Sequence, residues 1–190
     1  MIHYQVTMQH DESTLQALAH MQYDLFNKKN LVVRTVISFA ALAVGVLNYN
    51  KWWGVLLLVY GAYMSSSKYA QANHTANKMV KGIKNAGIAF PVTRYVFREH
   101  AVEIIGMPEN KPLRDPLKYS EIYKIGEDAR HFYLFRDQYG GYTVPKQELG
   151  KQVDEFRKFL EERAGQECST GARKAPIVRV VEFFEKRKRK

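Results

Sequence analysis

The chain has 190 residues, which is enough for one modest soluble domain besides a membrane segment. Its single cysteine, Cys168, excludes an internal disulfide and suits a domain in the cytoplasm. The net charge of +10 is concentrated in residues 25–98, with ten basic and no acidic residues, and in residues 173–190, with eight basic and two acidic residues. Because both basic regions adjoin apolar segments or the C-terminus, we expect anionic lipid as a partner and not nucleic acid.

The N-terminal residues predict a strand followed by a helix. Ile2–Met8 alternate between apolar and polar residues, as in a half-buried strand, and nothing in the first 30 residues resembles a signal peptide. A helix is expected to open at Asp11, with Ser13 and Gln16 at the spacing of a capping box. An isolated strand cannot satisfy its backbone, so we predict that it joins an edge of the sheet beginning near Val92, with Tyr4 and Val6 in its core. Pairing with a second copy of the chain is the alternative.

Two apolar runs, Leu31–Leu47 and Trp52–Met64, predict a transmembrane helical hairpin within residues 31–70. A membrane span needs about 20 residues, with about 17 as the lower limit. The first run has 17 residues, and three serines extend the second from 13 to 16 without a charge. A buried helical hairpin of a soluble protein is the alternative, and the mean hydropathy of −0.38 is typical of soluble chains.

The ends of this hairpin predict how it lies in the membrane. Trp52, Trp53 and Tyr69 are expected to anchor it at the membrane interfaces, and Arg34 is expected to extend towards the lipid headgroups. Basic residues flank the outer ends, whereas the connector carries only Lys51. The positive-inside rule therefore predicts a multi-pass protein of the cell membrane with both termini in the cytoplasm.

A juxtamembrane helix is expected to continue from the second span, with Ala72, Ala76, Met79 and Ile83 along one face. Its lysines could form a basic collar that contacts the anionic inner leaflet, and a merely solvated helix face is the alternative. The candidate lipid contacts in this region are Lys68, Lys78, Lys81 and Lys84.

From residue 92 the pattern is that of β structure, and a domain over residues 71–164 is predicted. Five short strands with tight turns predict an antiparallel meander. Leu149, Val153, Phe156 and Leu160 then mark the inner face of a closing helix. The predicted strands are Val92–Arg98, Ala101–Met107, Lys118–Ile125, His131–Arg136 and Gly141–Val144.

The order of these elements and several short aromatic motifs resemble the YcxB-like proteins of bacteria. The resemblance covers most of residues 1–163. It implies two transmembrane helices followed by a β-rich, pleckstrin-homology-like cytoplasmic domain, and it implies no catalytic residues. The motifs are Tyr95-Val96-Phe97, Tyr119-Ser120-Glu121-Ile122, Phe132-Tyr133-Leu134-Phe135, Val144-Pro145-Lys146 and Phe156-Arg157-Lys158-Phe159-Leu160.

Residues 165–190 lie outside the resemblance and form a separate basic tail in our interpretation. Ile177–Lys190 could be an amphipathic segment on the inner leaflet, with a disordered, solvated tail as the alternative. The lipid-contact candidates of the tail are Lys186, Arg187, Lys188, Arg189 and Lys190.

No motif for catalysis, a cofactor or a metal is present: the six histidines lack ligand spacing, and the common hydrolase and phosphate-loop patterns are missing. The sequence therefore favours an α+β membrane protein that serves as a membrane-anchored binding or scaffolding module. Its partner would be an unknown protein or another copy of the chain. The alternative is a membrane-associated enzyme that acts on a lipid or a peptide through an unrecognised site.

Overall fold

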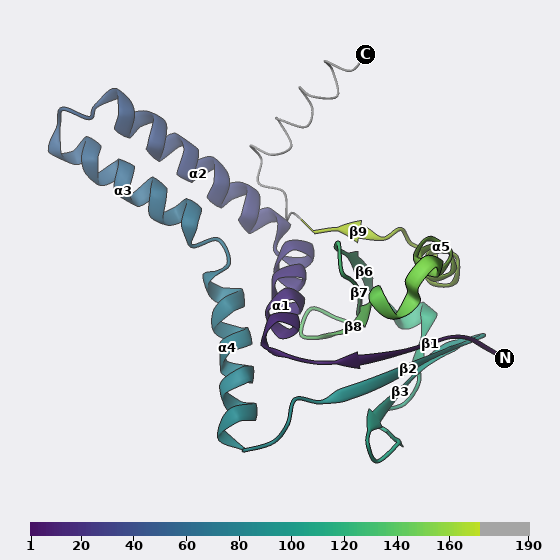
Figure 1. The fold of residues 1–190 in the computed structure, drawn as a ribbon. Helices are drawn as coiled ribbons and strands as arrows, with labels where there is room; N and C mark the ends of the chain where they lie inside the picture. The colour runs from purple at the N-terminus through teal and green to yellow at the C-terminus, as the bar shows by residue number, and fades with distance from the viewer. Residues whose placement is uncertain (172–190) are drawn as a thin grey trace.

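The computed structural model describes residues 1–171, and it has a β-rich body from which two antiparallel helices project (Figure 1). The projecting pair lies between β1 and β2 in the chain, so both of its ends return to the body. Four helices occupy this region: α1 (Glu12–Phe26), α2 (Lys28–Leu47), α3 (Trp52–Ser66) and α4 (Ala70–Asn85). The mixed α and β composition agrees with the predicted class.

The first sheet joins the N-terminal strand to strands that follow the helices. β1 pairs antiparallel with β2, and Val6 lies opposite Tyr95. Val6 is 1% exposed, and Tyr4 packs against the same core, so the predicted addition of the first strand to this sheet is confirmed. The strands are β1 (Ile2–Gln9), β2 (Val92–Arg98), β3 (Ala101–Met107), β4 (Lys111–Pro112) and β5 (Leu117–Lys118), with the last two both pairing with β3.

The second sheet has the order β8-β7-β6-β9, and it is antiparallel except for the short parallel pair of β6 and β9. Its central strand, β7, has four consecutive buried residues because both of its faces are covered. The bounds are β6 (Lys124–Glu127), β7 (His131–Phe135), β8 (Gly141–Pro145) and β9 (Ser169–Thr170).

The predicted strand Lys118–Ile125 is wrong, because the chain crosses from one sheet to the other within it. β5 ends at Lys118, a 3-10 turn occupies Tyr119–Glu121, and β6 begins at Lys124. Tyr119 and Ile122 are buried in the same core cluster at a spacing of three, which a turn allows, whereas a strand would direct them to opposite faces. The Tyr119 hydroxyl donates to the carbonyl of Arg98 at 2.8 Å and secures the crossing.

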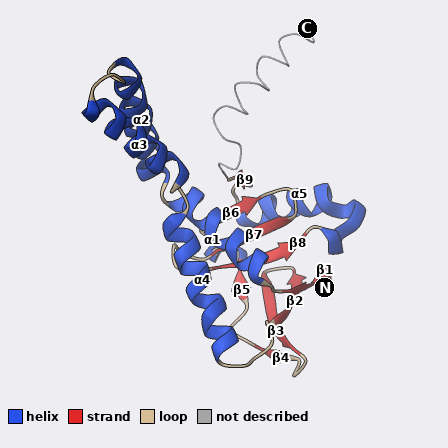
Figure 2. Ribbon diagram, turned by 60° about the vertical axis from the view of Figure 1, so that its left-hand side comes forward, coloured by secondary structure: helices blue, strands red, loops and turns tan. Residues whose placement is uncertain are grey.

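Helix α5 (Val153–Ala164) covers the core between the two sheets (Figure 2). Phe156 and Leu160 are fully buried, as predicted, whereas Leu149 lies in a preceding 3-10 segment (Gln147–Gln152). The Phe156 ring meets Phe97 of β2 edge to face, with centroids 4.8 Å apart. Such pairs stabilise beyond their buried area, so α5 ties the first sheet to the second.

Helix α1 lies against the outer face of the second sheet. Met21 and Leu25 pack there on Tyr133 and Phe135. Its N-terminal cap is Asp11, which bonds reciprocally with Thr14, so the predicted capping box of Ser13 and Gln16 is displaced by two residues. The Asp11 carboxylate can accept from the Thr14 N–H because Asp11 itself is extended.

Helix α4 packs along α1 and continues the chain back to β2. Its buried residues are Ala72, Ala76 and Val80, which recur every four residues. Met79, which was predicted to share a face with the two alanines, is 51% exposed and lies outside this buried stripe. Small alanines let the two helices approach closely, which places the base of the hairpin firmly on the body.

Candidate membrane interface

Small residues fill the contact between α2 and α3. The buried positions are Ser38, Ala41 and Gly45 in α2 and Gly54 and Gly61 in α3. A Cβ atom on Gly61 would lie 2.8 Å from Cγ of Leu42, and one on Gly45 would lie 2.8 Å from Cγ of Leu58. The helices therefore approach to a separation that only small residues permit, which is typical of helix pairs in membranes.

Two polar side chains at the contact of α2 and α3 find hydrogen-bond partners within the hairpin. The Ser38 hydroxyl donates to the carbonyl of Gly61 at 2.8 Å, and it lies 3.0 Å from the Ser65 hydroxyl. Arg34 donates from Nε to the carbonyl of Met64 at 3.2 Å and also bonds the Ser67 hydroxyl. Arg34 thus reaches the C-terminal end of α3 at the base of the hairpin, and its expected contact with lipid headgroups stays a prediction. Arg34 and Ser38 therefore have hydrogen-bond partners inside the hairpin, as a hydrocarbon environment requires of polar groups.

Large apolar side chains point away from the contact. No element of residues 1–171 covers them, and their exposed fractions run from 42% to 80%. This arrangement reverses the usual one of a soluble helical hairpin, in which the large apolar residues are inside. The exposed residues are Val32, Val33, Val36, Ile37, Phe39, Val44, Val46 and Leu47 in α2 and Val55, Leu56, Val59, Tyr60 and Tyr63 in α3.

The two helices differ in length. α2 has 20 residues and is about 30 Å long, and within the described part of the chain it is the one helix that is long and apolar enough to cross a membrane. α3 has 15 residues and is about 22 Å long. Its C-terminal Ser67 caps the helix through its backbone N–H to Tyr63, so the serines predicted to extend the second run do so only to Ser66.

The predicted interface anchors lie at opposite ends of the hairpin. Trp52 is 77% exposed beside the connector, and Lys51 lies over the neighbouring ring of Trp53 at 5.6 Å. Tyr69 follows α3 at the base, where its ring stacks on His20 with centroids 4.2 Å apart. Tyr69 therefore joins α3 and α4 to α1, and contact of these three aromatic residues with lipid stays a prediction.

The four lysines of the predicted collar have different surroundings in the structure: two form ion pairs and two are exposed. Lys68 forms an ion pair with Asp24, and Lys84 forms one with Glu12 at 2.5 Å, whereas Lys78 and Lys81 are exposed. Lys84 lies near the far end of α4, about 21 Å along the helix axis from Ala70. Contact of these lysines with lipid stays a prediction, and Lys186, Arg187, Lys188, Arg189 and Lys190 lie outside the described residues.

Asp24 is a site residue that the sequence reasoning missed. Its side chain is 1% exposed at the base of the hairpin, where Lys68 Nζ lies 3.2 Å from Oδ1. The Tyr69 hydroxyl donates to both carboxylate oxygens at 3.1 and 2.9 Å, and Lys68 donates to that hydroxyl at 2.7 Å. Its position in the sequence could have drawn attention to it, because Asp24 is the last acidic residue before a stretch of 74 residues that contains none.

A second buried carboxylate, Glu127, connects the second sheet to α5. Arg157 donates to both of its oxygens at 2.8 and 2.6 Å, and Lys146 bonds it as well. Burial by itself would raise the pKa of Glu127, but the hydrogen bonds from Arg157 and Lys146 outweigh burial and hold that pKa below its usual value. The hydrogen bond to Glu127 raises the pKa of Arg157, so both of these groups are ionised at neutral pH.

Chemical groups that suit a reaction or a metal are scarce in the described region. No set of three or more His, Cys, Asp or Glu within residues 1–171 is placed to hold a metal ion. Burial raises the pKa of Cys168 to about 12, and the Glu161 carboxylate reinforces the shift, so the thiol is protonated at neutral pH.

Comparison with known proteins finds one segment of the chain that is similar to a family. Residues 117–160, from β5 through the middle of α5, match the family model described as YcxB-like protein. Neither a curated protein nor a solved structure matches the chain. The pleckstrin-homology-like fold that the resemblance implied therefore stays a prediction. Residues 117–160 contain most of the aromatic motifs on which the resemblance was based, so the similarity to the YcxB-like family is shown for this segment of the chain.

Proposed function

We propose that this chain is a membrane-anchored binding module, in which α2 and α3 cross the bilayer as a hairpin and the β-rich body lies at its surface. The observation that carries the proposal is the reversed packing of the hairpin. Its inner contact contains Ser38, Gly45 and Gly61, and its outer face is formed by large apolar side chains. In water this outer face would be an aggregation liability, whereas in a bilayer it is solvated by lipid tails.

The short α3 can still cross a bilayer, because the mismatch in length can be accommodated and the residues at both ends of the hairpin suit the membrane interfaces. At about 22 Å it is shorter than the roughly 30 Å hydrocarbon core, and local thinning of the bilayer or a tilt of the pair can offset the mismatch. Trp52 and Trp53 at the connector would then lie in the distal interface. Tyr69 and Lys68 would lie near the proximal interface, where α3 gives way to α4.

The orientation follows from the basic residues. Lys28, Lys29 and Arg34 flank one end of the pair and Lys68 the other, whereas the connector carries only Lys51. This distribution supports a body in the cytoplasm, with both termini on that side. β1 and β2 belong to one sheet, so the two ends of the hairpin must leave the membrane on the same face as the body.

The body would recruit a partner to the membrane or pack against other copies of the chain. Its core is closed by α5, and the Glu127 cluster fixes that helix to the sheet, which gives a rigid surface next to the bilayer. A rigid scaffold with exposed loops is suited to binding.

Extraction of the full-length protein from membranes tests the anchor. We expect it to stay in the pellet after an alkaline carbonate wash and to be released by a nonionic detergent. A matched variant with Val36→Asp and Val59→Asp alters only the outer face of the hairpin and should lose membrane retention. Release of the unmodified protein by carbonate alone would refute the proposal.

A further inference from the structure

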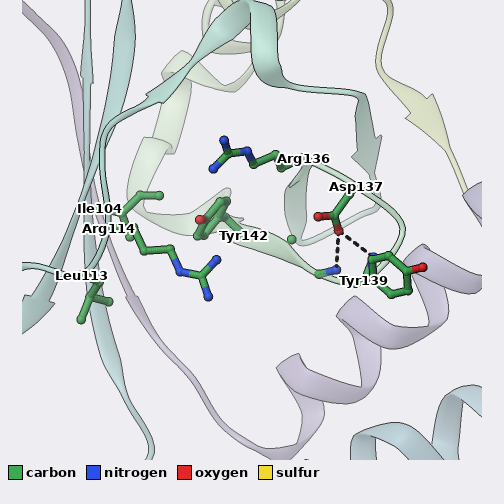
Figure 3. A pocket seen from close by; sticks show the side chains of 9 residues that line it. Ile104, Leu113, Arg114, Arg136, Asp137, Tyr139 and Tyr142 are labelled. Carbon is green, nitrogen blue, oxygen red and sulfur yellow. Dashed lines mark hydrogen bonds between the residues drawn. The ribbon is translucent and has the colours of Figure 1, made fainter.

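A cavity of about 340 Å³ opens between the loop after β4 and the β7–β8 turn (Figure 3). Ile104 of β3 and Tyr142 of β8 belong to different sheets, so the cavity lies where the two sheets separate. Its volume is at the lower end of the range of about 300–1,000 Å³ for small-molecule sites. The lining residues are Ile104, Leu113, Arg114, Arg136, Asp137, Tyr139, Gly140, Gly141 and Tyr142.

Two arginines from separate loops reach this cavity. Arg114 follows β4 and Arg136 follows β7, and in Figure 3 their guanidinium groups lie on either side of the Tyr142 ring. Within residues 1–171, Arg114 has no carboxylate within ion-pair distance. Arg136 lies 3.5 Å from Glu121, and both side chains are partly exposed, so this pair is weak and leaves donors available.

The one acidic residue in the lining, Asp137, accepts hydrogen bonds from the backbone. Asp137 Oδ1 accepts from the N–H of Tyr139 at 2.7 Å and from that of Gly140 at 3.3 Å. These bonds build the turn and engage one of the two carboxylate oxygens, and within residues 1–171 no ion pair joins Asp137 to Arg114 or Arg136. The cavity thus presents two guanidinium groups to a ligand and has an apolar wall of Ile104 and Leu113.

We propose that this cavity binds a phosphate monoester, with Arg114 and Arg136 as the two anion-binding residues. Guanidinium groups bind phosphate oxygens in bidentate pairs, and a dianion can accept such pairs from two directions at once. The Tyr142 ring and the apolar wall would hold the organic part of the ester. This assignment names a ligand class for the β-rich body and goes beyond its role as a binding module.

The β7–β8 turn lies close to the base of the hairpin, and this position indicates which phosphate-bearing ligands should be tested. Tyr139 also lines a second cavity, together with Phe26 and Asn27, which lie at the base of the hairpin where α1 gives way to α2. A phospholipid headgroup is therefore a possible source besides a soluble phosphate ester. Binding of a lipid headgroup depends on the proposed membrane anchor, whereas binding of a soluble phosphate ester does not.

Calorimetric titration of the full-length protein in uncharged detergent micelles separates these cases. The probes are glycerol 3-phosphate and dihexanoyl phosphatidic acid, with glycerol and dihexanoyl phosphatidylcholine as uncharged or zwitterionic controls. Binding of both phosphate esters identifies the phosphate group as sufficient, and binding of the phosphatidic acid alone identifies a lipid headgroup site. No binding of either ester at millimolar concentration overturns the proposal.

Variants assign the binding to this cavity. Arg114→Gln and Arg136→Gln should each weaken it by about tenfold, the change expected when a charge-assisted hydrogen bond is lost. Arg136→Lys keeps the charge without the bidentate fork and should recover only part of the affinity. Arg130→Gln, at an exposed position outside the cavity, is the matched control and should bind as the unmodified protein does.

Both arginines in the lining are exposed, so their replacement should leave the melting temperature unchanged. Binding that survives in the Arg114→Gln, Arg136→Gln double variant would place the anion elsewhere and overturn the assignment. Failure of the membrane anchor would appear in carbonate extraction and would leave the glycerol 3-phosphate titration unaffected, so the two proposals fail separately.

Discussion

The carboxylate of Asp24, the last acidic residue before the hairpin, lies 3.2 Å from Nζ of Lys68, the first basic residue after it. The pair spans 44 positions of sequence and closes the base of the hairpin where α1, α3 and α4 meet. Tyr69 bonds the same carboxylate. The Asp24 carboxylate therefore binds both the Lys68 ammonium and the Tyr69 hydroxyl, and this buried cluster helps to fix the angle between the hairpin and the body.

Asp24→Asn tests the strength of this junction. We expect a loss of about 1–3 kcal/mol in the free energy of unfolding, because the variant removes the buried carboxylate charge that lies beside the mostly buried Lys68 ammonium. Glu12→Gln is the matched control, since it removes the exposed pair with Lys84, in which both side chains are more than half exposed. It should change stability by less than about 1 kcal/mol. Thermal unfolding in detergent measures both, and equal effects would show that burial at the junction does not matter.

Gly61→Leu tests the packing of the hairpin. A side chain at this position would meet Leu42 and the carbonyl of Ser38, so the helices must separate at a cost of about 1–3 kcal/mol. Gly82→Leu on α4 is the control, because no heavy atom lies within 4 Å of its Cβ position and leucine favours a helix over glycine. Limited proteolysis of the connector in detergent should accelerate for the first variant only. Equal protection in both variants would contradict the close approach of α2 and α3.

Glu127 predicts how stability depends on pH. Its pKa in the folded state is below the ordinary value of 4.5, so the unfolded chain takes up the proton at a higher pH than the folded chain. The stabilisation is fully present above about pH 4.5 and decreases as the pH falls through the folded pKa. Glu127→Gln should lower the melting temperature at pH 7 and flatten the dependence below pH 5. Glu109→Gln, at an exposed position, should leave both the melting temperature and the slope unchanged.

Cysteine labelling tests the topology, but Cys168 is a poor reporter. Its pKa of about 12 keeps the thiol protonated, so it would resist a thiol reagent on either side of the membrane. In a Cys168→Ser background, Asn50→Cys should react with an impermeant reagent in intact cells. Lys158→Cys, exposed on α5, should react only after permeabilisation. The reverse pattern would place the body outside the cell.

The basic tail, which lies outside the described residues, should bind membranes through its charge. A soluble carrier fused to residues 173–190 should bind anionic vesicles at low salt and detach as the salt concentration rises, because exposed charges are screened beyond about 8 Å at physiological ionic strength. Equal binding to neutral vesicles would contradict the electrostatic account.

Local patterns in the sequence were enough to predict the hairpin and most strands. Residues 92–98 and 101–107 became β2 and β3 with the predicted bounds, because alternation and turn residues are local properties. The pairing of β1 with β2 was also predictable, since a lone strand needs a partner and the hairpin returns the chain to the same side. The break between Lys118 and Lys124 was missed, because a change of sheet depends on the packing of both sheets and not on the local pattern.

The candidate sites were decided by tertiary structure. Asp24 and Lys68 were each visible as charges, but only the folded chain brings them together and removes Lys68 from a free basic collar. Arg114 and Arg136 come from two loops whose separation is set by how the sheets diverge, and no spacing in the sequence relates them. Periodicity determines which face of an element is buried, because it arises within one element. The meeting of side chains from distant segments depends on the relative placement of those elements, which the packed core alone determines.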